Sequence, residues 1–96
     1  MPQFLVLADD FTDPDALQRR LGVRKQHLAR MKEEKAKGHF ISGGAKLNDA
    51  GQMYGSMLVI ELPDINAANE WIRQDPYITG RVWDKMQVVP FRIADV

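Results

Sequence analysis

Apolar residues along the chain fall into two patterns, unbroken runs and positions spaced like the turns of a helix. Phe4–Ala8 form an unbroken apolar run, which is typical of a strand covered on both faces. Asp13 and Pro14 then provide an N-cap followed by proline at the first helical position. Apolar residues recur at helical spacing after them, at Ala16, Leu17, Leu21, Leu28 and Met31. We therefore predict a strand followed by a long helix that extends to Lys37.

Glycine marks two points in this helical segment. Gly22 costs about 1 kcal/mol relative to alanine inside a helix, so the segment is either continuous or starts as a short helix or turn before a main run from Val23. Gly38 is the expected end of the helix. Lys35 and Lys37 precede it, and their charges complement the negative end of the helix dipole.

The second half of the chain predicts a pair of strands and two further capped segments. We expect strands at His39–Ser42 and Met53–Leu62, joined by a polar, glycine-bearing connection over Gly43–Gln52. Asp64 caps a second helix whose apolar face consists of Ile65, Ala68, Trp71 and Ile72. Asp75-Pro76 repeats the capping signal and predicts a single helical turn, after which Val82–Ile93 form the last strand.

The predicted order of elements is β-α-β-β-α-β within a single domain, residues 1–96. This order is typical of a ferredoxin-like α+β fold, in which an antiparallel sheet carries both helices on one face. The strands are nevertheless apolar on both alternations, with Leu58 and Ile60 on one and Met57 and Val59 on the other. We therefore expect a second copy of the chain to cover the other face, which gives a homodimer through the sheet face. The alternative is a monomer whose open face binds another protein or an apolar ligand.

The composition of the chain argues against two classes of protein, those that bind nucleic acid and those that cross a membrane. Thirteen basic residues balance thirteen acidic ones, so the positive field expected of a nucleic-acid-binding protein is missing. No segment approaches the roughly 20 apolar residues that a membrane helix needs, and the first apolar run is too soon interrupted by Asp9-Asp10 for an export signal. The absence of cysteine suits the cytoplasm. We expect a cytoplasmic protein that binds neither nucleic acid nor membrane and acts on a small-molecule ligand.

Two residues are the leading candidates for catalysis. His27 follows the helical spacing to the edge of the buried stripe, where a side chain with an unperturbed pKa near 6.5 can act as general acid or base. Asp75 lies at a helix start, where backbone N–H groups hold a carboxylate rigid, and it can orient an imidazole. The alternatives are a surface histidine and a plain N-cap.

Four further residues are candidates for substrate binding. Arg24 lies one turn before His27 and suits an anionic substrate, although a solvated or ion-paired arginine is the default. Asp10 ends the first strand, where it either points into a pocket or begins a loop. Gly44 and Ser56 belong to glycine-containing steps that let backbone N–H groups approach a ligand. We expect no metal and no cofactor, because no ligand motif is present.

Several short motifs together resemble the YciI-like (YCII-related) family. They occur in the family's order over nearly the whole chain: Arg24-Lys25-Gln26-His27-Leu28-Ala29-Arg30, Gly38, Gly44, Gly55-Ser56, Asp75-Pro76-Tyr77 and Val89-Pro90-Phe91. The chain departs from the family where Gly43-Gly44-Ala45 replaces the usual Ala-Gly-Pro, which puts the shape of the pocket in question.

The resemblance implies a dimeric α/β-barrel fold, shared with muconolactone isomerase-like proteins, and a pocket with a catalytic His and Asp that match His27 and Asp75. Most members have no assigned reaction, while one relative eliminates HCl from a chlorinated hydroxyhydroquinone. We therefore expect a cofactor-independent lyase or isomerase that uses His/Asp acid-base catalysis on a small, aromatic or anionic metabolite. The alternative is a non-catalytic small-molecule-binding or interaction module.

Overall fold

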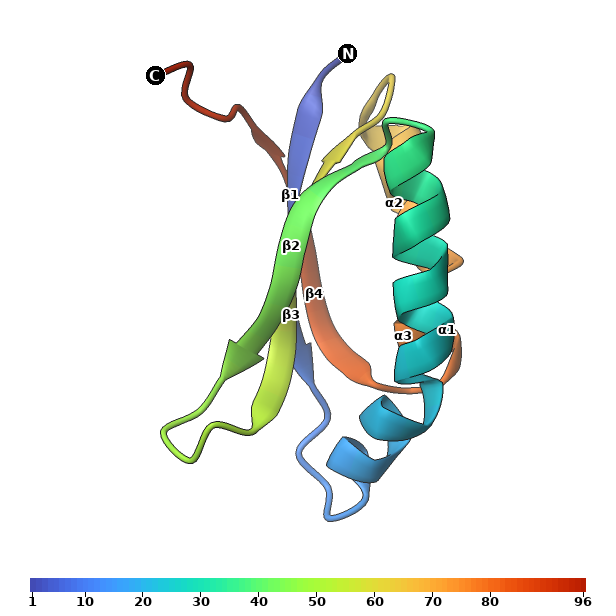
Figure 1. The fold of residues 1–96 in the computed structure, drawn as a ribbon, viewed down its shortest axis with the longest axis vertical. Helices are drawn as coiled ribbons and strands as arrows, with labels where there is room; N and C mark the ends of the chain where they lie inside the picture. The colour runs from blue at the N-terminus through green and yellow to red at the C-terminus, as the bar shows by residue number, and fades with distance from the viewer.

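A single antiparallel sheet with all helices on one side forms the protein (Figure 1). The computed structural model describes residues 1–96. Its strands lie in the order β2-β3-β1-β4, and each pairs antiparallel with its neighbours. The predicted ferredoxin-like α+β fold is therefore confirmed. The elements are β1 (Gln3–Asp10), α1 (Ala16–Ala36), β2 (Phe40–Leu47), β3 (Met53–Glu61), α2 (Ile65–Arg73), α3 (Pro76–Thr79) and β4 (Trp83–Phe91).

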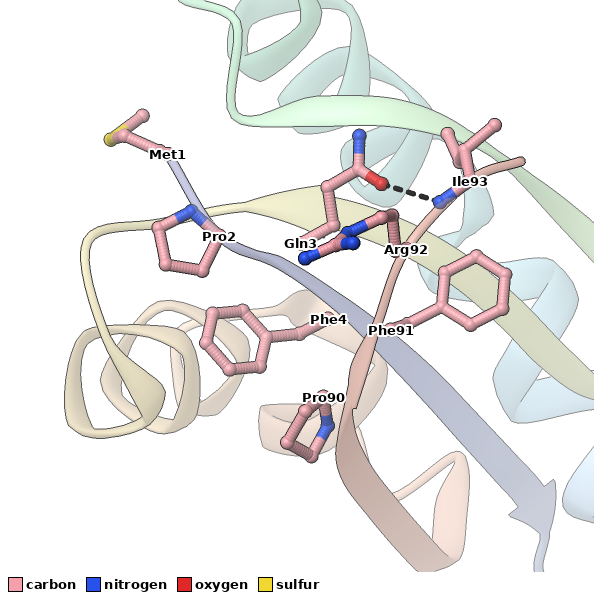
Figure 2. Close-up of a pocket in the computed structure, with 8 residues that line it drawn as sticks. All are labelled: Met1, Pro2, Gln3, Phe4, Pro90, Phe91, Arg92 and Ile93. Atoms are coloured by element: carbon pink, nitrogen blue, oxygen red, sulfur yellow. Dashed lines mark hydrogen bonds between the residues drawn. The ribbon is translucent and has the colours of Figure 1, made fainter. Parts of the chain in front are cut away.

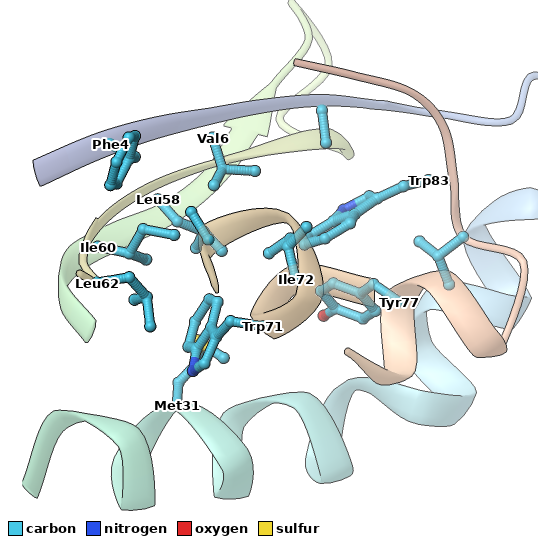
Figure 3. Close-up of a cluster of buried hydrophobic side chains, with 13 residues drawn as sticks. Phe4, Val6, Met31, Leu58, Ile60, Leu62, Trp71, Ile72, Tyr77 and Trp83 are labelled. Atoms are coloured by element: carbon cyan, nitrogen blue, oxygen red, sulfur yellow. The ribbon is translucent and has the colours of Figure 1, made fainter. Parts of the chain in front are cut away.

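The core lies between the sheet and the helices (Figure 3). On β1 the inward positions Phe4, Val6 and Ala8 are buried, and β3 adds Leu58 and Ile60 beside them. The other members of this cluster of 13 buried residues are Met31, Leu62, Ala68, Trp71, Ile72, Tyr77, Val82 and Trp83. Only one of the 13, Met31, comes from α1.

Polar side chains dominate the buried stripe of α1, which differs from the prediction. Leu21 and Leu28, predicted on the apolar face, are 48% and 46% exposed. His27 is not at the edge of the stripe but within it. The buried positions are Ala16, Arg20, His27, Met31 and Glu34. The apolar spacing was right for Ala16 and Met31 but wrong for Leu21 and Leu28. Polar residues take the other buried positions because each has a partner on another element, which offsets the cost of burial.

The first helix also begins later than predicted. The Asp13 carboxylate accepts a hydrogen bond from the backbone N–H of Asp15 and pairs with Arg19 at 2.7 Å, so it stabilises the turn before α1 rather than capping it. The helix then runs through Gly22 without a break. Gly38 adopts a φ of +82°, in the left-handed region that favours glycine, and ends the helix as predicted.

Strand β2 is longer than predicted, and the expected connection from Gly43 is wrong. Pairing with β3 continues past this point, from Gly43 opposite Leu58 to Lys46 opposite Gly55. A Cβ at position 43 would lie 2.4 Å from the carbonyl oxygen of Met57, so the two strands approach as closely as they do only because Gly43 lacks one. Glycine here marks close strand contact instead of a loop.

The two short helices begin where the sequence predicts. The carboxylate of Asp64 accepts from the backbone N–H of Ala67, and that of Asp75 accepts from Tyr77. These are the N-cap bonds expected of aspartate. None of the helices in the structure is long and apolar enough to cross a lipid bilayer.

The face of the sheet opposite the helices carries apolar side chains. Leu5 lies between Val59 and Val89 on the neighbouring strands, and Leu7 lies next to Met57. Met57 is 40% exposed, and no helix covers this face (Figure 1). The alternation of apolar positions predicted from the sequence is thus present.

Candidate active site

His27 and Asp75 meet in a buried hydrogen bond between α1 and the start of α3. The Nδ1 atom of His27 lies 2.8 Å from Oδ1 of Asp75. Oδ1 also accepts from the backbone N–H of Tyr77 at 2.9 Å, and the Asp75 side chain is fully buried. The N-cap geometry of α3 therefore fixes the carboxylate, and the carboxylate in turn fixes the imidazole.

Arg30 binds the other oxygen of the same carboxylate. Its Nη1 donates to Oδ2 of Asp75 at 2.9 Å, and its Nη2 donates to the backbone carbonyl of Trp71. The guanidinium also lies over the Trp71 ring, 4.3 Å from the centroid. Sequence reasoning did not single out Arg30, although its place one turn after His27 on the same helix was the available signal.

The second ring nitrogen of His27, Nε2, makes no hydrogen bond. The only fully buried side-chain polar atom without a partner is Nε of Arg20, so Nε2 keeps some access to the surface. The imidazole stacks on Tyr77 with centroids 4.0 Å apart and meets Trp83 edge-on at 6.1 Å. In the tautomer that carries its proton on Nδ1, the imidazole donates to Asp75 and the lone pair lies on Nε2.

A second polar cluster joins β1, α1, β3 and β4. Arg20 is 2% exposed and donates through Nη1 to both carboxylate oxygens of Asp10 and through Nη2 to Oγ of Ser56 at 2.8 Å. Nε1 of Trp83 donates to the same hydroxyl at 3.1 Å. Burial raises the pKa of Asp10 more than the Arg20 guanidinium lowers it. Asp10 and Ser56, both predicted to bind substrate, thus lie together and hold Arg20.

Tyr77 connects the two clusters. The Arg20 guanidinium lies 4.6 Å from the centroid of the Tyr77 ring, which also stacks on His27. Burial raises the pKa of the Tyr77 hydroxyl. An arginine and a histidine that share one aromatic neighbour are close enough for substitution of one cluster to affect the other.

A third cluster surrounds Glu34 at the far end of α1. Its carboxylate accepts from Nδ1 of His39 at 3.0 Å, from Nζ of Lys37 at 3.0 Å and from Nε1 of Trp71. Burial raises the pKa of Glu34, but these three donors together lower it to about 2. This cluster joins the end of α1 to α2 and to His39, the residue before β2, and it shares Trp71 with Arg30.

The remaining predicted residues lie outside these clusters. Arg24 is exposed, one turn before His27 on α1. Gly44 lies on the edge strand β2, opposite Met57. Their roles in substrate binding stay predictions, as do those of Asp10 and Ser56.

Three pockets in the surface are lined by residues other than His27. The pocket in Figure 2 has a volume of about 770 Å³ and lies between the start of β1 and the end of β4, with Phe4 and Phe91 among its walls. A second pocket, of about 350 Å³, is lined by Asp10 and Tyr54 at the other end of β1. Through Asp10, the buried Arg20 cluster therefore reaches a surface pocket.

The chain is similar to a known domain family over most of its length. Residues 3–92 match the YCII-related domain. An uncharacterized protein of Haemophilus influenzae is 32% identical over 96 residues, which cover 93% of this chain and 95% of the relative. Protein YciI of Escherichia coli is 32% identical over 95 residues, with the same coverage.

Solved structures extend the likeness to the fold. The 5-chloro-2-hydroxyhydroquinone dehydrochlorinase of Burkholderia phenoliruptrix, solved with 2,5-dihydroxybenzoquinone, is 25% identical and gives a TM-score of 0.81 over 96% of this chain and 95% of that one. An antibiotic biosynthesis monooxygenase, 15% identical, shares the fold with a TM-score of 0.55, covering 96% of this chain and 99% of its own. The resemblance drawn from the sequence motifs is confirmed, and the chain belongs to the YCII-related family.

Proposed function

We propose that the protein is a cofactor-independent lyase or isomerase in which His27 transfers a proton of a small metabolite. The observation that carries this proposal is the buried hydrogen bond of 2.8 Å between Nδ1 of His27 and Asp75, together with the unpaired Nε2 on the same ring. A histidine held in one tautomer by a carboxylate is the usual arrangement of a general base.

The proposed step is a proton abstraction followed by elimination or rearrangement. Nε2 of His27 takes a proton from the substrate, and the electron pair of the broken bond forms a new double bond. In a lyase the leaving group departs with its own bonding pair; in an isomerase the proton returns at another atom of the substrate. Asp75 stabilises the imidazolium that forms, and Arg24 or backbone N–H groups hold negative charge on the substrate.

The proposed substrate class is a small, aromatic or anionic metabolite. Support comes from the dehydrochlorinase that is 25% identical to this chain and was solved with a dihydroxybenzoquinone. Arg24, exposed beside the His27 turn, supplies a positive charge for such a ligand. Asp10 and Ser56, which meet at Arg20, and Gly44 are the other proposed binding residues.

A homodimer through the open sheet face completes the proposal. The apolar side chains of Leu5, Leu7 and Met57 face away from the helices, and burial against a second copy removes them from water. In an isologous dimer the two identical sheets pack face to face, so each copy contributes the same surface to the interface. The cytoplasm stays the predicted location.

Chloride release tests the proposed chemistry directly. With 5-chloro-2-hydroxyhydroquinone as the probe, we expect His27→Gln to lower the rate by about 10²- to 10⁴-fold, the usual contribution of a general base. His39→Gln, which removes the other histidine of the chain, is the matched control and should leave the rate unchanged. Equal rates for His27→Gln and the wild type would falsify the assignment of His27.

A non-catalytic binding module is the second candidate. The observation in its favour is that His27 is only 6% exposed and that the pocket of about 770 Å³ lies at the other end of the sheet. Calorimetry with the 2,5-dihydroxybenzoquinone probe separates the two candidates. If the protein binds 2,5-dihydroxybenzoquinone but releases no chloride from 5-chloro-2-hydroxyhydroquinone, the result supports the non-catalytic binding module.

A further inference from the structure

Asp75 is shared between two basic side chains of α1. His27 occupies Oδ1 and Arg30 occupies Oδ2, at 2.8 and 2.9 Å, and both side chains come from neighbouring turns of the same helix. The carboxylate is fully buried, while the Arg30 side chain is 17% exposed. A single buried negative charge therefore faces two groups that are able to carry a positive one.

Only one of these two groups is permanently charged. The guanidinium of Arg30 stays protonated at every relevant pH, whereas an imidazole loses its proton near neutrality. With Arg30 bound, the Asp75 carboxylate is already balanced, and a proton on His27 would leave the cluster with a net positive charge. Without Arg30, the same proton would form a neutral ion pair in a buried site, which is the more stable state.

We propose that Arg30 is a positioning residue: its fixed charge balances the buried Asp75 carboxylate, so that His27 stays neutral with its lone pair on Nε2. Arg30 is itself held in place, because its Nη2 donates to the Trp71 carbonyl and its Cζ atom lies 4.3 Å from the centroid of the Trp71 ring. The catalytic consequence rests on the proposed function, whereas the charge balance itself does not.

The other charged and titratable groups around His27 either favour the neutral imidazole, as Arg30 does, or carry no net charge. Arg24 on α1 adds positive charge on the exposed side. Tyr77 of α3 stacks on the imidazole, and burial keeps its hydroxyl protonated by raising its pKa. Beyond Tyr77, the charge of Arg20 is paired with that of Asp10. Asp75 is therefore the one negative group that favours a charged His27, and Arg30 opposes it.

Nitrogen NMR of the full chain tests this proposal without any substrate. In the wild type well above neutrality, we expect the proton on Nδ1 and the lone pair on Nε2 of His27. Arg30→Gln keeps a hydrogen-bond donor but removes the charge, so the titration midpoint of His27 should rise by about one pH unit, a tenfold loss of the neutral ring at a fixed pH. Arg30→Lys keeps the charge and should leave the midpoint within about 0.3 unit.

Arg73→Gln is the matched control, because this exposed arginine pairs only with Glu70. Three results overturn the proposal: a wild-type ring with its proton on Nε2, a rise of less than about half a unit in Arg30→Gln, or an equal rise in Arg73→Gln. If Arg30→Gln does not fold, two measurements still test the proposal: the position of the ring proton of His27 in the wild type, and the titration midpoint of His27 in Arg30→Lys. Failure of the chloride-release assay leaves these measurements intact, and the two proposals are thus tested separately.

Discussion

The imidazole of His27 lies flat against the ring of Tyr77, with centroids 4.0 Å apart and planes inclined by 15°. Stacking fixes the plane of the imidazole, and the hydrogen bond to Asp75 fixes its rotation within that plane. The direction of Nε2 is thus set by two independent contacts.

Tyr77 variants separate the role of the ring from that of the hydroxyl. We expect Tyr77→Phe to keep the stack and change the free energy of unfolding by less than about 1 kcal/mol. Tyr77→Ala should cost about 3 to 5 kcal/mol, because it removes a side chain that is 1% exposed and leaves a cavity. Urea denaturation measures both values. Similar losses for the two variants would show that the hydroxyl, not the ring, holds this region together.

Ser56→Ala removes an acceptor shared by two buried donors. Nη2 of Arg20 and Nε1 of Trp83 both donate to its hydroxyl, so the variant leaves two unpaired donors. Each unpaired buried donor costs about 1 to 3 kcal/mol, and we expect a loss of about 2 to 6 kcal/mol in the free energy of unfolding. Ser42→Ala, at an exposed position of β2, is the control and should lie within about 0.5 kcal/mol of the wild type.

The lowered pKa of Glu34 predicts that the protein loses stability in acid. Its pKa falls from an ordinary 4.5 to about 2 on folding, so the folded state favours the carboxylate. The stability that it contributes is complete above about pH 4.5 and is lost as the pH falls towards 2. Thermal unfolding of the wild type and Glu34→Gln across this range should give curves that converge in acid. A constant gap between the two proteins would contradict the assignment.

Met57→Lys tests the proposed dimer. Met57 is 40% exposed on the open face of β3, and in an isologous pair a lysine there would place an unpaired charge in each half of the interface. We expect the wild type to sediment as a dimer and Met57→Lys as a monomer. Leu28→Lys replaces an apolar residue of similar exposure on α1, on the helix side, and should remain a dimer. A wild type that sediments as a single chain at high concentration rules out the homodimer.

Signals that act locally were sufficient to predict most of the fold. Asp64 and Asp75 cap the helices that follow them, and Gly38 ends α1, because these effects depend on a few adjacent residues. The inward and outward alternation of β1 and β3 was predictable for the same reason, since the period of a strand is two.

Features that depend on distant partners were not predictable from one sequence. Glycine at positions 43 and 44 favours a loop locally, and only the facing strand β3 turns this segment into part of the sheet. The prediction of the buried face of α1 was incomplete for the same reason: Arg20 and Glu34 are polar, and nothing near them in the sequence shows that Ser56 or Trp71 will pair with them. The structure brings the predicted residues His27 and Asp75 into contact, and it adds Arg30, whose partner is the same carboxylate.

The polar residues of the α1 stripe follow a regular spacing, with Arg20, His27 and Glu34 each seven positions apart. Seven residues are close to two turns, so the three side chains leave the helix in nearly the same direction at different heights. Each meets a different part of the fold, at Asp10, Asp75 and Trp71. Hydrocarbon contacts tolerate sliding by a fraction of a turn, but three separate hydrogen-bonded contacts do not. The helix consequently has a single longitudinal setting against the sheet, and any displacement along its axis requires at least one of these bonds to break.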